Sequence, residues 1–85
     1  MKVVYSKRFV RGFKKLLPEI QDRVRAADRA FKRDHKGRRL RLHKLHGDLS
    51  GFQSFSIDFQ YRILVEFKKH DLALFADIGT HDIYD

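Results

Sequence analysis

The sequence contains no cysteine, and proline occurs only once in its 85 residues. Without cysteine, a disulfide scaffold, a thiol nucleophile and a cysteine-based zinc site are all excluded, which fits a reducing cytosol. The longest uninterrupted apolar run, from Leu72 to Ala76, is far shorter than the ~20 residues that span a membrane. The N-terminal residues also lack the apolar core of a signal peptide. We therefore expect a cytoplasmic protein with no membrane partner.

Acidic residues are scarce relative to basic ones, because 19 Lys and Arg stand against 11 Asp and Glu and give a net charge of +8. The two signs are also segregated along the chain. Residues 32–44 include seven Lys and Arg and one aspartate, whereas residues 71–85 include four aspartates and no Lys or Arg. This pattern is typical of a surface that binds a polyanion, and it favours a nucleic acid, an anionic membrane or an acidic protein as the partner.

Hydrophobic periodicity predicts one domain, residues 1–85, with seven elements. Ser6 is a candidate N-cap for the first helix, Pro18 a candidate first residue of the second, and Gly37 a candidate stop after it. The expected strands are 1–5, 38–46, 52–58, 61–67 and 72–78, and the expected helices are 7–17 and 18–36. This β-α-α-β-β-β-β order predicts an α+β fold, in which an N-terminal helical hairpin covers one face of a small antiparallel sheet. The other face would stay open to solvent or a ligand.

The alternation within the expected strands assigns side chains to the two faces of the sheet. Tyr61, Ile63, Val65 and Phe67 would face the core, and Arg62 would point from the opposite face. In strand 38–46, Arg41 and His43 would turn away from Leu40 and Leu42, and in strand 72–78 the expected alternating apolar set is Leu72, Leu74, Ala76 and Ile78. The sheet would therefore be apolar behind and basic in front.

Most catalytic motifs are absent, including a glycine-rich phosphate loop, a nucleophilic serine elbow and a metalloprotease helix. His43 and His46 lie three residues apart, so on one strand they would point to opposite faces, and no nearby carboxylate completes a metal site. We expect neither a metal nor a cofactor. His43, Arg62 and His81 remain, with Tyr84 near the last of them.

These residue types suit the metal-free cleavage of RNA. A base removes the proton of the ribose 2′-OH, a cation stabilises the charge on the phosphate, and an acid protonates the departing 5′-oxygen. Histidine suits either proton transfer because its ordinary pKa of about 6.5 is close to working pH. Structural roles are the alternative: Arg62 could pair with Glu66 or Asp58, His81 could bond a backbone carbonyl, and Tyr84 could fill the edge of the core.

Three segments, HKLHGDLSGF, QYRILVEF and ADIGTHDIY, resemble the RelE/ParE superfamily of bacterial toxins, with the nearest likeness to its YafQ- and YoeB-type branch. The resemblance covers nearly the whole chain and implies a RelE-like fold. It also implies the toxin of a type II toxin–antitoxin pair, most often an endonuclease that cuts mRNA in the ribosomal A site. The implied partners are mRNA, the ribosome with its rRNA, and an acidic, partly disordered antitoxin that docks around the helical hairpin.

The resemblance implies a role for each candidate residue. His43 would be the general base, Arg62 would stabilise the transition-state phosphate, His81 would be the general acid, and Tyr84 would orient the mRNA base. The residues expected to bind RNA are Lys36, Arg38, Arg39, Arg41, Lys44 and His46.

The sequence departs from the YafQ-like pattern at Ser56 and Gln60, where relatives carry a histidine and an aspartate. Two alternatives therefore stay open: a ParE-like inhibitor of DNA gyrase, and a catalytically degenerate binding module. Five phenylalanines are expected in the core or against the antitoxin rather than stacked on bases: Phe52, Phe55, Phe59, Phe67 and Phe75.

Overall fold

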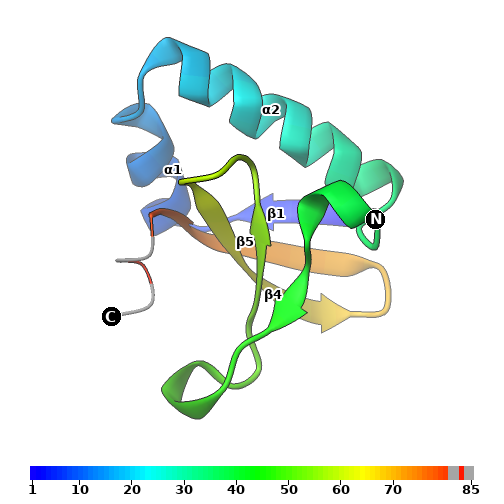
Figure 1. The fold of residues 1–85 in the computed structure, drawn as a ribbon. Helices are drawn as coiled ribbons and strands as arrows, with labels where there is room; N and C mark the ends of the chain where they lie inside the picture. The colour runs from blue at the N-terminus through cyan, green and yellow to red at the C-terminus, as the bar shows by residue number, and fades with distance from the viewer. Residues whose placement is uncertain (81–82, 84–85) are drawn as a thin grey trace.

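A computed structural model describes residues 1–80 and residue 83 of the chain. Two helices lie over one face of a five-stranded sheet (Figure 1). The strands are β1 (Lys2–Tyr5), β2 (His43–Lys44), β3 (Gln53–Ser56), β4 (Arg62–Lys69) and β5 (Leu72–Gly79), and the helices are α1 (Lys7–Lys14) and α2 (Pro18–Arg33). Two short 3₁₀ turns flank β2, η1 (Arg38–Leu40) and η2 (Gly47–Leu49). No described helix has the length and apolar character needed to cross a membrane.

The strand order in the sheet is β1-β5-β4-β3-β2. Strands β2 to β5 form the expected antiparallel meander, so the α+β class and the predicted order of these elements are confirmed. The expectation of a wholly antiparallel sheet is wrong, because β1 pairs with β5 in parallel from Lys2 opposite Leu72 to Tyr5 opposite Phe75. Side-chain alternation reports which face a residue occupies, but it carries no information about strand direction.

The core lies between the helices and the sheet. Its centre is Phe31, whose ring centroid is 5.0 Å from that of Phe55 and 5.1 Å from that of Phe75. Ile63 and Val65 are fully buried beside them, as the alternation in the sequence predicted. The buried stripe of α2 is also as expected: Ile20, Val24, Ala27 and Phe31. The cluster therefore joins the second helix to the three central strands.

Ser6 begins α1 as predicted and also ties it to the sheet. Its Oγ accepts a hydrogen bond from the Phe9 N–H at 2.9 Å and donates one to the Ala76 carbonyl at 2.7 Å. An N-cap of this kind satisfies one of the unpaired N–H groups at the start of a helix. One hydroxyl thus sets both the start of α1 and its position against β5.

Both helices end earlier than predicted, at Lys14 rather than Leu17 and at Arg33 rather than Lys36. Gly37 is not the left-handed stop, because its φ is −58°. Asp34 ends α2 instead, and its Oδ1 accepts a hydrogen bond from the Lys36 N–H at 3.2 Å. An aspartate that bonds the backbone two residues onward competes with helical hydrogen bonding.

The predicted strand 38–46 is also wrong. Residues Arg38–Leu40 form a 3₁₀ turn, and only His43–Lys44 pair with β3. Arg41 between them has φ 52° and ψ 44°, which is the left-handed region. The alternation read across this segment therefore does not apply to Leu40 and Arg41.

The core face of β5 differs from the prediction as well. Ala73 and Phe75 are fully buried in the core cluster, and of the predicted set Leu72, Leu74, Ala76 and Ile78 only Ile78 belongs to it. The alternation of side chains along β5 shifts by one residue at Ala76. Leu64 pairs with Asp77 and Val65 pairs with Phe75, so Ala76 is an extra residue with no partner position on β4. A bulge of this kind shifts alternation by one position.

Candidate functional site

Three neighbouring strand positions form a polar row on the face of the sheet away from the helices. Ser56 is paired with Arg62, and Arg62 with Gly79. Their strand neighbours Phe55 and Ile63 are fully buried in the core, so Ser56 and Arg62 point the other way. The orientation predicted for Arg62 is confirmed. Its Nη1 donates a hydrogen bond to the Ser56 Oγ at 3.0 Å, which draws the guanidinium from β4 toward β3.

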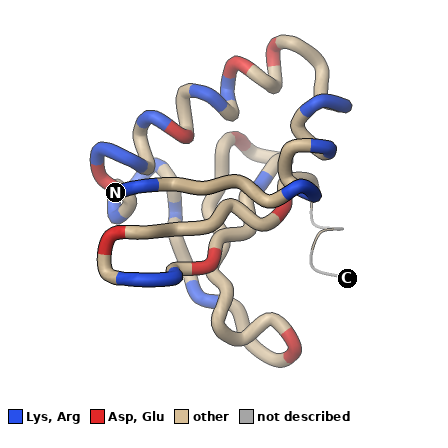
Figure 2. Tube along the Cα trace, turned by 180° about the vertical axis from the view of Figure 1, so that it is seen from behind, with Lys and Arg blue, Asp and Glu red and all other residues tan. Residues whose placement is uncertain are grey.

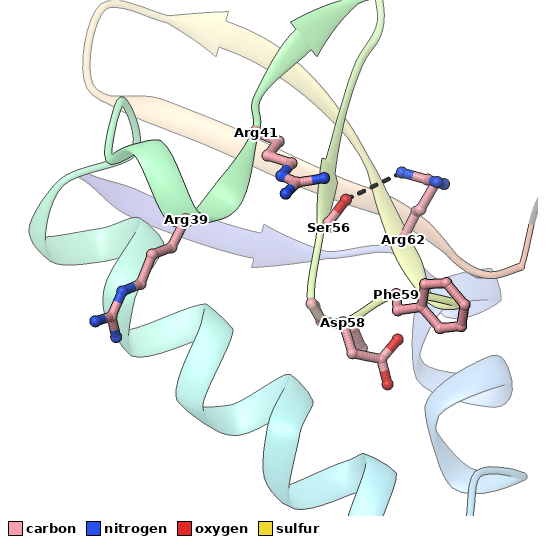
Figure 3. A pocket seen from close by; sticks show the side chains of 7 residues that line it. Arg39, Arg41, Ser56, Asp58, Phe59 and Arg62 are labelled. Atoms are coloured by element: carbon pink, nitrogen blue, oxygen red, sulfur yellow. Dashed lines mark hydrogen bonds between the residues drawn. The ribbon is translucent and has the colours of Figure 1, made fainter.

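A pocket of about 540 Å³ opens over this row. Figure 3 shows the guanidinium of Arg41 reaching toward Ser56 and Arg62, while the Arg39 side chain extends away from them along α2. Seven residues line the pocket: Arg39, Arg41, Ser56, Ile57, Asp58, Phe59 and Arg62. Three guanidinium groups therefore share one concave surface with a single carboxylate.

Arg41 reaches the pocket through an unusual backbone conformation. Its φ of 52° is the only positive value at a non-glycine residue among the described residues. For a side chain with a Cβ this conformation costs about 1–2 kcal/mol. Strained residues of this kind cluster at functional sites, where the surrounding structure holds them.

The loop between β3 and β4 forms another wall, and Asp58 organises it. Asp58 Oδ1 accepts hydrogen bonds from the backbone N–H groups of Gln60 at 2.8 Å and Tyr61 at 2.7 Å. Its Oδ2 forms an ion pair with Arg23 Nη1 on α2 at 2.9 Å. Burial opposes ionisation, but the Tyr61 and Gln60 N–H groups and the Arg23 guanidinium outweigh it and hold the pKa of Asp58 below its usual value. The carboxylate is therefore ionised at neutral pH.

Phe59 projects from this loop, and 92% of its surface is exposed. Of the two places expected for Phe59, the core and the antitoxin surface, this exposure excludes the core, whereas Phe55 and Phe75 are fully buried there. Phe59 also takes part in none of the ring contacts between described aromatic residues that join Phe31, Phe55 and Phe75. It stands at the pocket beside Arg62 (Figure 3).

His43 lies on the same face of the sheet as Arg62. It pairs with Ser54, which pairs with Leu64, so it is two strands and two residues away from Arg62. Standard strand spacings place the two Cα atoms about 12 Å apart. His43 is exposed, and its Nδ1 lies 2.9 Å from the Arg41 carbonyl oxygen. Because a carbonyl oxygen only accepts, Nδ1 carries the proton, and in the neutral ring Nε2 has the lone pair.

The remaining predicted residues are more dispersed. Lys36 and Arg38 are exposed but do not line the pocket. Lys44 and His46 line a separate hollow of about 300 Å³ at the turn between β2 and β3. Lys44 pairs with Gln53, which pairs with Val65, so Lys44 lies on the other face from His43. The predicted acid His81 and the predicted positioning residue Tyr84 lie outside the described residues.

The two carboxylates that the sequence suggested as ion-pair partners of Arg62 pair with other residues. Asp58 pairs with Arg23, and Glu66 Oε1 pairs with Lys68 Nζ at 3.0 Å. Sequence reasoning noticed Ser56 only as a departure from a family pattern and gave Asp58 no functional role. The Asp58–Phe59–Gln60 segment begins with a typical turn residue, and this was the one available signal that the phenylalanine beside it would be exposed.

The pocket suits a phosphate. Guanidinium groups bind phosphate oxygens through two parallel hydrogen bonds. Arg41, which lies between η1 and β2, and Arg62 on β4 approach the same space. Residues 1–80 and 83 hold no group of three metal-binding side chains. The described site is a basic pocket that can accept an anion, with a histidine on the same face of the sheet.

Neither a family model nor a curated protein sequence matches this chain. Solved structures do. YafQ from E. coli strain BL21(DE3) has a TM-score of 0.80 at 13% identity and covers 98% of this chain and 96% of its own. The YoeB/ParE toxin from Agrobacterium tumefaciens has a TM-score of 0.77 at 16% identity, with coverages of 95% and 99%. The RelBE2 toxin–antitoxin complex from Mycobacterium tuberculosis has a TM-score of 0.67 at 24% identity, with coverages of 94% and 96%. The chain shares the fold of these toxins.

Proposed function

We propose that the protein is the toxin of a type II toxin–antitoxin pair and cleaves mRNA on the ribosome. The observation that supports this most directly is that Arg41 and Arg62 both line one pocket of about 540 Å³ beside Ser56, on a fold shared with YafQ and YoeB/ParE toxins. Because its substrate would be ribosome-bound mRNA, the protein would act in the cytoplasm.

The proposed reaction uses the nucleophile of the RNA itself. Nε2 of His43 takes the proton of a ribose 2′-OH, and the 2′-oxygen forms a bond to the phosphorus as the bond to the 5′-oxygen breaks. Arg62 and Arg41 bind the phosphate oxygens as negative charge accumulates on them. His81 is the proposed acid that protonates the departing 5′-oxygen, and Tyr84 the proposed contact to the base. Strand β5, which precedes both, ends at Gly79 opposite Arg62.

An antitoxin partner is supported by a second, separate surface. Several large apolar side chains on β1, α1 and the turn after it are exposed: Val4, Tyr5, Val10 and Leu17. Lys7, Arg11 and Lys14 on α1 are exposed among them. Such a surface suits an acidic segment with apolar anchors that folds on binding, and the related RelBE2 and YafQ toxins were solved with antitoxins.

The test replaces Arg62 with alanine and induces the protein in bacteria, with mapping of mRNA 5′ ends. Removing a group that stabilises transition-state charge lowers cleavage by about 100-fold or more, so growth arrest should be relieved. Lys69→Ala is the matched control, because it removes the same charge from the exposed far end of β4. Circular dichroism checks that both variants fold.

Wild-type protein that arrests growth without new 5′ ends in the A site would refute the nuclease. DNA damage dependent on gyrase would then support the ParE-like alternative. If Arg62→Ala cleaves mRNA as well as Lys69→Ala does, the proposed nuclease activity stands but Arg62 has no part in its mechanism.

A further inference from the structure

We propose that Phe59 is the stacking platform for an unpaired RNA base whose neighbouring phosphate lies between Arg41 and Arg62. This inference rests on the proposed function, since it assigns a substrate contact within the same pocket. It begins from the 92% exposure of a phenylalanine that the fold does not use. Burying a phenylalanine would stabilise the fold by roughly 1.5–3 kcal/mol, and none of this is realised at position 59.

The loop that presents Phe59 is ordered by groups other than Phe59. The Ile57 N–H donates to the Tyr61 carbonyl at 3.1 Å, and Asp58 accepts the N–H groups of Gln60 and Tyr61. The Arg23–Asp58 ion pair fastens the same turn to α2. None of these contacts requires an aromatic side chain at position 59. The backbone that carries the ring is therefore ordered before any ligand arrives, which lowers the entropy cost of binding.

The surroundings of Phe59 favour a nucleobase over a protein partner. Protein-binding hot spots lie at the centre of packed, water-excluding contacts. Around Phe59 the other lining residues are three arginines, Ser56 and Asp58, with Ile57 as the one apolar neighbour. Sites for single-stranded nucleic acid combine these two features, a cationic groove for the backbone and an aromatic ring for a base. Stacking accepts any base, so Phe59 would contribute affinity with little sequence preference.

The binding experiment uses a short single-stranded RNA in which every ribose is 2′-O-methylated, so that it binds but cannot be cleaved. Phe59→Ala should weaken binding about five- to 150-fold, the range measured for stacking of one base on an aromatic ring. Phe59→Leu keeps an apolar side chain without a ring and should lose nearly as much. In a series of oligonucleotides with one abasic position each, one member should bind the wild type more weakly than the complete oligonucleotide does. For Phe59→Ala, the same member should bind as tightly as the complete oligonucleotide.

A spectroscopic readout is available because the sequence contains no tryptophan. Phe59→Trp introduces a single tryptophan at the proposed platform and should retain RNA binding. Its tryptophan fluorescence, which can be excited selectively over that of the three tyrosines, should be quenched by the complete oligonucleotide but not by the critical abasic one. Circular dichroism of all variants confirms that the loop substitution leaves the fold intact.

Each outcome separates this inference from the proposed function. Equal RNA affinity of wild type and Phe59→Ala, with A-site cleavage retained, overturns the platform and leaves the nuclease standing. Phe59→Ala that is inactive in cells but binds RNA normally assigns Phe59 to a protein contact and also overturns it. Stacking without any cleavage by the wild type supports the platform and refutes the nuclease. Failure of the wild type to bind any oligonucleotide overturns the platform, and the mapping of mRNA 5′ ends then decides on the nuclease separately.

Discussion

The side chain of Arg41 lines the pocket, while its backbone has the strained left-handed conformation. Substitutions can separate the effect of the side chain on RNA binding from the effect of the backbone on stability. Glycine adopts the left-handed region without the Cβ clash, although it also increases the entropy of the unfolded chain. We expect Arg41→Gly to raise the free energy of unfolding by up to about 1 kcal/mol relative to Arg41→Ala, while both lose the same RNA affinity. Thermal unfolding and oligonucleotide binding measure the two effects. An Arg41→Gly variant no more stable than Arg41→Ala would mean that the backbone strain at this position does not exceed the entropy that glycine adds to the unfolded chain.

Residue-level prediction from the sequence succeeded where the local pattern has one physical solution. Arg62 lies between Tyr61 and Ile63 in a clear alternation, so its face was determined. Phe59 has no such neighbours, and hydrophobicity alone assigned it to either the core or the antitoxin surface. Its exposure depends on the turn that Asp58 closes with Gln60 and Tyr61, which is a hydrogen-bonding feature and not a hydrophobic one.

The loop from Ile57 to Tyr61 is the element on which the pocket wall depends, and Asp58 is its central group. Asp58→Asn keeps an oxygen for the two N–H donors but loses the ion pair with Arg23, whose side chain is 57% exposed, so it should cost under about 1 kcal/mol of unfolding free energy. Asp58→Ala loses both and should cost about 1–3 kcal/mol. It should also weaken RNA binding as Phe59→Ala does. Equal melting temperatures for the two variants would show that the N–H bonds contribute little.

The same carboxylate gives a pH dependence whose sign follows from its lowered pKa. Because the folded protein binds this proton less tightly than the unfolded chain, Asp58 stabilises the fold fully above the unfolded pKa. That contribution is lost as pH falls through the folded pKa. The wild type should therefore be more stable than Asp58→Asn at neutral pH, and the difference should shrink below about pH 4.

At the level of elements, the sequence predicted types better than boundaries or neighbours. Ser6 and Pro18 mark helix starts through chemistry that is local to them, and both were correct. The first five residues of β5, Leu72 to Ala76, are all apolar, so alternation could not select the core face there. The bulge at Ala76 then changes the face within the strand, and only the pairing with β4 reveals it.

For the molecule as a whole, the net charge of +8 is spread more widely than the basic run in residues 32–44 suggests. Figure 2 shows Lys and Arg along both helices as well as near the sheet. Helix α1 and the turn after it carry five cations, Lys7, Arg8, Arg11, Lys14 and Lys15. The expectation that basic residues gather on one face of the sheet was therefore too simple. One group of cations lies on α1 and the turn after it, and another, Arg39, Arg41 and Arg62, lines the pocket.

The two surfaces can be distinguished by the salt dependence of RNA binding, since each phosphate contact on a single strand contributes about 0.7 to the slope of log K against log salt concentration. Arg39→Ala combined with Arg41→Ala should lower that slope by about 1.4 if both contact phosphates, and by about 0.7 if Arg39, which extends along α2, does not. Lys14→Ala combined with Lys15→Ala is the control, because it makes the same change in net charge on exposed residues at the end of α1. Its slope should equal that of the wild type. If both pairs lowered the slope equally, RNA would follow the total charge of the protein and the pocket would have no special part in binding.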